Sequence, residues 1–216
     1  MSPSPHELRR ARPDDAGFLA WVVLAATRSH CPRGFFDLLV PESDSERLGL
    51  IEELVLQEKP SWWHWSLFWI ATRAGEPAAA LSGFDPTRIA SAHLAVPEAL
   101  AARGIGGERL AAGFARCAPL VACFHDAAPG AWIVESVATR PEARGAGLAG
   151  ALLDRVLEEG REAGYALSQL TIFIGNTPAQ RVYESRGFRI GAEKRSAAFE
   201  AAIGAPGLAQ MNCSLS

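Results

Sequence analysis

Cysteine is scarce in this chain of 216 residues, and the cysteines that occur are scattered along it. There are four, without a Cys-x-x-Cys pair and without the spacing of a zinc site or a disulfide framework: Cys31, Cys117, Cys123 and Cys213. We therefore expect no metal centre. A reducing cytoplasm is the simplest location for such a protein.

An excess of charge of one sign and long apolar runs are also missing. Lys and Arg number 21 against 24 Asp and Glu, and the net charge of −3 creates no field that would recruit nucleic acid or an anionic membrane. A membrane span needs about 20 apolar residues, and FLAWVVLAA (residues 18–26) is much shorter. The residues before Asp14 lack the apolar core of a signal peptide. We expect neither a nucleic-acid nor a membrane partner.

Hydrophobic residues are plentiful, at 49% of the chain, and neither a repeat nor a linker divides it. This favours one domain over residues 1–216. HELRRARPDDAG predicts a strand that ends at Pro13, followed by a helix capped by Asp14 or Asp15.

The following segment predicts a helix and a hairpin. The helix is expected to begin near Ser43 or Ser45 and to end before Pro60, and the hairpin to turn at Gly75.

Two further segments are less regular. Residues 87–128 are alanine-rich and helical in pattern, with breaks expected at Pro97, Gly104–Gly107 and Pro119. At the C-terminal end, FRIGAEKRSAAFE and GLAQMNCSL predict two strands around a loop at 204–207.

The pattern is sharpest between residues 131 and 190. AWIVESVAT (131–139) predicts a strand, and a helix is expected from about Gly147 to Gly164. LSQLTIFIG (167–175) predicts another strand, followed by a helix with Thr177 as its cap.

The loop after residue 139 fits two phosphate-binding patterns. Gly145, Gly147 and Gly150 have the G-x-G-x-x-G spacing of a dinucleotide site, but such a site also needs an acid at the end of the next strand, and none lies between Ala163 and Tyr183. The second pattern is R-x-x-G-x-A, which begins at Arg144 and places a cation beside flexible backbone that can surround a pyrophosphate. A plain strand-to-helix turn is the remaining interpretation.

Residues 131–190 resemble the GNAT superfamily of acyl-CoA-dependent N-acyltransferases. The acetyl-CoA loop of that family, [R/Q]-x-x-G-x-[G/A], corresponds to RGAGLA (144–149). Its second signature, an Asn that ends a strand and is followed by Ala, Tyr and Gly-Phe, corresponds to NTPAQRVYESRGF (176–188). LRRARPDDAGFLAWV, at the N-terminus, also resembles the first strand and helix of the family.

The resemblance implies an α/β (α+β) fold of GNAT type, with a mixed central sheet splayed between the fourth and fifth strands and flanked by helices. Residues 131–190 would form the acetyl-CoA-binding core, and residues 28–130 the variable acceptor side. Pantetheine, an amide chain, would pair with the exposed backbone of the first core strand. The cofactor-binding residues expected by position are Val137, Ala138, Thr139, Arg144, Gly145, Ala146, Gly147, Leu148, Ala149, Asn176, Ala179 and Tyr183.

Acetyl transfer to an amine needs a neutral amine, stabilisation of an oxyanion and a proton for the departing thiolate. The resemblance places Tyr183 beside the thioester sulfur, and a phenol with a pKa of about 10 stays protonated at neutral pH, so Tyr183 is the expected acid. A buried ring with a solvated hydroxyl is the alternative.

Glu135 is the expected base, because it lies in an otherwise apolar strand where burial would raise its pKa. It could instead pair with an arginine or face solvent, and some members of the family use only water.

The acceptor amine is left open, and so is a homodimer. SWWHWSLFW (61–69) fits either an aromatic wall for the acceptor or part of the core. A non-catalytic acyl-CoA-binding module is the alternative function, and an NAD(P)-dependent enzyme is a third hypothesis.

Overall fold

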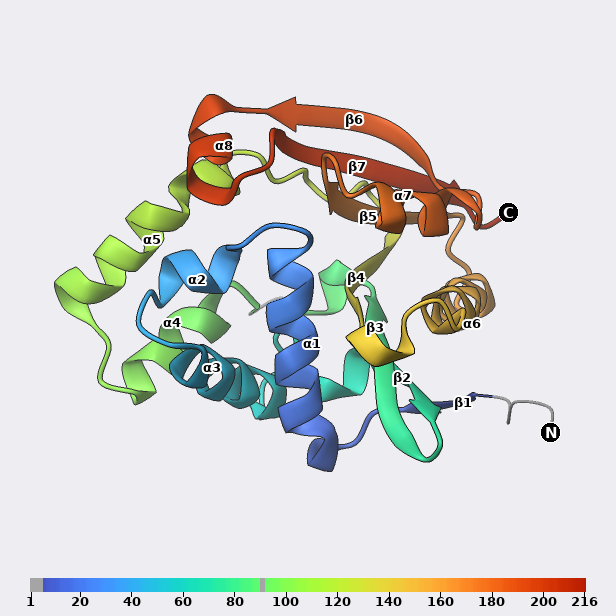
Figure 1. Ribbon diagram of the computed structural model, residues 1–216, viewed down its shortest axis with the longest axis horizontal. Helices are drawn as coiled ribbons and strands as arrows, with labels where there is room; N and C mark the ends of the chain where they lie inside the picture. The colour runs from blue at the N-terminus through green and yellow to red at the C-terminus, as the bar shows by residue number, and fades with distance from the viewer. Residues whose placement is uncertain (1–5, 90–91) are drawn as a thin grey trace.

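The computed structural model describes residues 6–89 and 92–216. One mixed sheet of seven strands runs through the molecule in the spatial order β1-β2-β3-β4-β5-β7-β6 (Figure 1). The strands are β1 (Glu7–Arg10), β2 (Phe68–Arg73), β3 (Glu76–Phe84), β4 (Ala131–Thr139), β5 (Leu167–Phe173), β6 (Arg189–Arg195) and β7 (Gly207–Ser214). Neighbouring strands are antiparallel except for β4 and β5, which run parallel. The expectation of a mixed sheet is confirmed.

Helices cover both faces of this sheet. They are α1 (Ala16–Arg28), α2 (Phe35–Leu39), α3 (Asp44–Leu56), α4 (Ala92–Ala102), α5 (Gly107–Val121), α6 (Leu148–Glu162), α7 (Thr177–Glu184) and α8 (Ala197–Ile203). Ser43 caps α3 as expected, since its side chain accepts a hydrogen bond from the amide of Glu46. Among the described residues, no helix is long and apolar enough to cross a membrane.

The alternation of side chains along β4 separates two hydrophobic clusters. Val134 packs with Leu152 and Val156 of α6, and the same cluster contains Tyr183 from α7. Ala138 packs with the second cluster, which contains residues from α1 to α5 and α8. We call these sides the α6 face and the α1 face. Figure 1 shows α6 on the opposite side of the central strands from α1.

The structure corrects the expected breaks at two prolines. Pro97 lies inside α4 and Pro119 inside α5. A proline removes one helical hydrogen bond, but burial of neighbouring side chains such as Leu100 and Leu120 in the α1-face cluster offsets that loss. The expected break at 104–107 is confirmed, since α4 ends before Gly104 and α5 begins at Gly107.

The ends of the chain also differ from expectation. The first strand ends at Arg10 rather than at Pro13. Residues 197–203 form α8 and not the continuation of a strand, because the hydroxyl of Ser196 accepts a hydrogen bond from the amide of Phe199 and so caps a helix.

Candidate active site

The two parallel strands at the centre of the sheet separate after a short contact. Residues 131–133 of β4 pair with residues 167–169 of β5. Beyond Ile133, β4 pairs with β3, and beyond Gln169, β5 pairs with β7. We call this divergence the fork. The facing backbone edges inside it lack a strand partner in the described part of the chain, so they can hydrogen-bond an extended amide ligand.

A β-bulge lies on the β4 side of the fork. Glu135 pairs with Ser82 and Ala138 with Ala80, so that Ser136 and Val137 stand opposite Leu81 alone. Ser136 adopts a left-handed φ of 53°, which costs a non-glycine residue about 1 kcal/mol or more. Bulges of this kind change the direction of the backbone and of the side chains. A serine in a strand does not predict a bulge.

The expected pantetheine-binding strand contains this bulge. Val137 packs toward the α6 face and Ala138 toward the α1 face. Thr139 ends the strand opposite Ala79. The three residues therefore lie along the fork, past the last pair between β4 and β5.

Glu135 lies two residues past the last pair between β4 and β5. Val134 points to the α6 face, so Glu135 points to the α1 face. The carboxylate is half-buried, and it has neither an ion-pair nor a hydrogen-bond partner among residues 6–89 and 92–216. Burial raises the pKa of Glu135 to about 7. The alternative of a pairing arginine is not seen.

Tyr183 approaches from the opposite face. Its ring packs edge-on against Phe188, with ring centroids 6.1 Å apart, and the residue is 8% exposed. Gly187, with a φ of 90°, ends the segment after α7 and lets the amide of Phe188 bond the carbonyl of Tyr183. Burial raises the pKa of the phenol further above its ordinary value, so it stays protonated. In the described structure the hydroxyl has no side-chain or backbone partner.

The glycine loop after β4 leaves backbone amides free. Gly145 and Gly147 both have a φ of 78°, and a Cβ at either would meet nothing, so conformation rather than space requires glycine. Neither amide donates to a backbone carbonyl in the described structure, whereas that of Ala146 bonds Ala143 at 3.4 Å. Leu148 and Ala149 open α6, and the first amides of a helix have no partner within it.

Two arginines flank this loop. Arg144 is exposed, and its guanidinium has no partner among the described residues. Arg140 stacks over Phe18 and Trp21, 5.2 and 5.3 Å from the ring centroids, and donates through Nε to the carbonyl of Pro77. Arg140 was missed in the sequence, because its aromatic partners come from α1.

The third glycine of the G-x-G-x-x-G spacing has a different role. A Cβ on Gly150 would lie 2.1 Å from Nη2 of Arg186, so the missing side chain makes room for an arginine that follows α7. Gly150 therefore lies inside α6, against the Arg186 side chain.

Asn176 joins α7 to the end of α1. It is the N-cap of α7, in place of the expected Thr177, and its Oδ1 accepts from the amide of Ala179 at 3.2 Å. The prediction of Thr177 was wrong because Asn and Thr are both good caps, and the position at which β5 ends determines which of them caps α7. The Nδ2 atom of Asn176 donates to the hydroxyl of Ser29 at 2.8 Å. Ala179 is half-buried on the α6 face.

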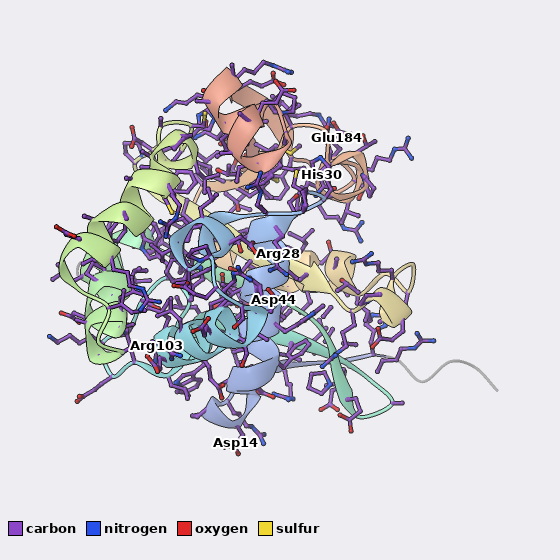
Figure 2. All side chains as sticks on the ribbon, turned by 60° about the vertical axis from the view of Figure 1, so that its left-hand side comes forward. Asp14, Arg28, His30, Asp44, Arg103 and Glu184 are labelled. Carbon is purple, nitrogen blue, oxygen red and sulfur yellow. The ribbon has the colours of Figure 1, made fainter. Side chains whose placement is uncertain are left out.

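Ion pairs join α1 to α2 and α3, and another forms within α3. Arg28 contacts Asp37 at 2.6 Å and Asp44 at 2.5 Å, and Arg47 contacts Asp44 at 2.6 Å. Figure 2 shows Arg28 and Asp44 side by side, with His30 beyond them on the side of α7 and Glu184.

The tryptophan-rich segment is divided between the two faces. Trp63 packs against Phe35 and Phe36 in the α1-face cluster, with ring centroids 6.3 and 5.3 Å away. Trp69 lies between the guanidinium groups of Arg10 and Arg155, at 4.5 and 4.8 Å. These rings are part of the fold and do not form one wall.

Comparison with known proteins supplies the family context. Residues 105–188 match the model of the acetyltransferase (GNAT) family. None of the curated protein sequences matches the chain.

Solved structures share the fold over nearly the whole chain. A crystal structure titled as an acetyltransferase is 17% identical, with a TM-score of 0.69 over 97% of this chain and all of the other. An N-acetyltransferase from Staphylococcus aureus Mu50 is 18% identical, with a TM-score of 0.67 over 95% of this chain and 99% of the other. The structure of yncA from Salmonella typhimurium, solved with its cofactor acetyl-CoA, is 17% identical, with a TM-score of 0.55 over 99% and 95%. At these identities the likeness is one of fold.

Proposed function

We propose that the chain, whose residues 105–188 match the model of the GNAT acetyltransferase family, transfers an acetyl group from acetyl-CoA directly to an amine within a ternary complex. The observation that carries this proposal is the fork, whose unpaired backbone edges open beside the half-buried Glu135. Residues 131–190 would bind acetyl-CoA, and residues 28–130 would form the acceptor side of a single domain.

The residues at the fork fit the chemical groups of acetyl-CoA. The free amides of Gly145 and Gly147, with those that open α6, suit a pyrophosphate, and Arg144 adds a positive charge. Leu148 is buried, so it would contribute only its amide. Val137 to Thr139 would pair with the pantetheine arm, as would a remaining N–H of Asn176.

The proposed chemistry uses groups from both faces of the sheet. Acetyl-CoA supplies a thioester whose acyl carbon is open to attack by an amine. Glu135, on the α1 face, would remove a proton from the acceptor ammonium, either directly or through water. Tyr183, on the α6 face, would donate a proton to the departing thiolate. A backbone amide near the bulge at Ser136 would stabilise the oxyanion.

Calorimetric titration of the purified protein with acetyl-CoA, CoA, NAD⁺ and NADP⁺ tests the cofactor. We expect acetyl-CoA and CoA to bind, and Arg144→Ala to weaken both by about 10-fold, since a charged hydrogen bond contributes about 1.5 kcal/mol or more. Arg88→Ala is the matched control, because Arg88 is an arginine with 78% of its side chain exposed that lies outside the loop. Binding of a nicotinamide nucleotide without a response to CoA would overturn the proposal.

A panel of amines then separates an enzyme from a binding module. Incubation with acetyl-CoA and a polyamine, lysine, an aminoglycoside or a peptide, followed by mass spectrometry, should reveal one class with an added acetyl group. Binding of acetyl-CoA without acetylation of any member would favour the non-catalytic alternative.

A further inference from the structure

Helix α1 bridges the two strands that separate at the fork. Its body packs on β4. Its C-terminal cap, Ser29, accepts the hydrogen bond from Asn176, which follows β5. The two residues are 147 positions apart, and they connect the acceptor side of the chain to the cofactor side. A side-chain hydrogen bond thus links the end of α1 to the segment that follows β5.

The backbone at Ser29 is held in an unusual conformation. Its φ of 57° and ψ of −119° are rare for any residue other than glycine. The amide of Ser29 bonds the carbonyls of Ala25 and Ala26 at 3.0 and 3.1 Å, and the neighbouring Arg28 is fixed by Asp37. Strain of this kind persists where the surroundings determine the geometry, and it is common at binding sites.

The hydrogen bonds of Asn176 fix which way its amide points. Because Oδ1 accepts from the amide of Ala179, Nδ2 must face Ser29. That nitrogen carries two hydrogens, so one stays free after the bond to Ser29 is made. The ring of His30 covers the adjacent Gly175, with Nε2 3.3 Å from the position of a Cβ on that glycine. The end of α1 therefore contacts both Gly175 and Asn176.

The bond to Ser29 is not needed to form helix α7. Asn176 already caps α7 through Oδ1, and that cap is local to residues 176–179. The role of the Ser29 hydroxyl is thus separable from the folding of α7.

We propose that Ser29 is a positioning residue that orients the amide of Asn176 across the fork, so that the acceptor-side end of α1 sets the affinity for the pantetheine arm of acetyl-CoA. This inference rests on the proposed function and extends it. It couples the two halves of the site, because a change in the α1–α2 loop alters cofactor binding through one hydrogen bond.

Two substitutions separate the hydroxyl from the strain. Ser29→Ala removes the hydroxyl and keeps a Cβ at positive φ, whereas Ser29→Gly removes the hydroxyl and relieves the strain. Both are titrated with CoA and with adenosine 3′,5′-bisphosphate, which has the nucleotide part of CoA but no pantetheine. We expect both variants to bind CoA about 3- to 10-fold more weakly, as the loss of one hydrogen bond predicts, and to bind the bisphosphate like the wild type. Ser29→Gly should melt at or above the temperature of Ser29→Ala.

A double substitution tests the route of the effect. In an Asn176→Ala background, Ser29→Gly should cause no further loss of CoA affinity, because the hydroxyl then has no amide to orient. Wild-type CoA affinity in Ser29→Gly, equal weakening of the bisphosphate, or additive effects in the double variant would each overturn the inference. If the wild-type protein binds both ligands but the variants lose affinity for both equally, only this inference fails. If the wild type binds neither ligand, the proposed function fails first.

Discussion

The arginines of the α1 face and the arginine of the glycine loop before α6 differ in their partners. On the α1 face, Arg28 and Arg47 both pair with Asp37 of α2, and Arg116 donates to the carbonyls of Leu38 and Leu39. In the loop that leads to the α6 face, Arg144 is exposed and has no partner in the described structure. An arginine that holds helices together is already satisfied, whereas an unpaired one beside free amides retains its affinity for an anion.

The backbone amides of the two regions differ in the same way. On the α1 face, the amide of Gly34 donates to the buried carboxylate of Asp37 at 2.9 Å. In the glycine loop, the amides of Gly145 and Gly147 have no such acceptor among the described residues. These polar groups of the α1 face are therefore already paired within the protein, whereas those of the loop before α6 are available to a ligand. Three substitutions test this contrast.

The largest effect is expected on the α1 face, from Asp37→Ala. Its carboxylate is 7% exposed, and its removal leaves the amide of Gly34 without its acceptor and Arg28 with only the exposed Asp44, which should lower the free energy of unfolding by about 3 kcal/mol. Urea denaturation measures it. Asp44→Ala is the matched control, because Asp44 also pairs with Arg28 but is 56% exposed, so its loss should cost at most about 1 kcal/mol.

The exposed fraction decides this ranking, although Arg28 lowers the pKa of both carboxyls and brings that of Asp44 to about 2. Solvent screens the Asp44 pair, so its pKa overstates its contribution to stability. Equal losses in the two variants would remove the distinction between scaffold and surface.

The next effect belongs to the α6 face. Tyr183→Phe keeps the buried ring and removes only the hydroxyl, so we expect stability and CoA affinity close to the wild type and turnover lower by about 100-fold or more. The measurement is the rate of acetylation of the best amine in the panel at saturating acetyl-CoA. Turnover near the wild-type rate would leave Tyr183 as a packing residue.

The smallest effect is expected for Glu135→Gln, which should lower activity but raise stability. With a pKa of about 7 the carboxylate is the active base, so kcat/KM should rise with pH up to about 7 and level off above it, and Glu135→Gln should lose this dependence along with much of its rate. A wild-type profile that is flat from pH 6 to 8 would contradict this role.

Stability gives an independent check on the same residue. Burial raises the pKa in the folded state above its ordinary value of 4.5, so ionisation destabilises the folded protein as pH rises from 4.5 through 7. Glu135→Gln should therefore be more stable than the wild type by about 1 to 3 kcal/mol at pH 8, with the difference vanishing near pH 4. Thermal melts at the two pH values measure it.

Local chemistry explains what could be predicted from the sequence. The glycines at 145 and 147 require positive φ, the apolar periodicity of residues 148–157 defines the buried side of α6, and Gly187 ends the segment after α7. Asn176 and Tyr183 are two turns apart on one helix. Each of these features depends on residues within a few positions of one another, so a linear pattern records it.

The remaining features depend on contacts between segments that are distant in the sequence. Ser136 is an ordinary strand residue until β3 pairs with β4 one residue out of step. Gly150 fits a nucleotide loop until Arg186 occupies the space beside it. Asn176 meets Ser29 because α1 crosses from β4 to the end of β5. The positive φ angles and many of the helix ends follow from short segments of sequence. The bulge, the half-buried position of Glu135 and the bond across the fork arise from contacts between distant segments, whose formation depends on how the whole chain buries its apolar surface.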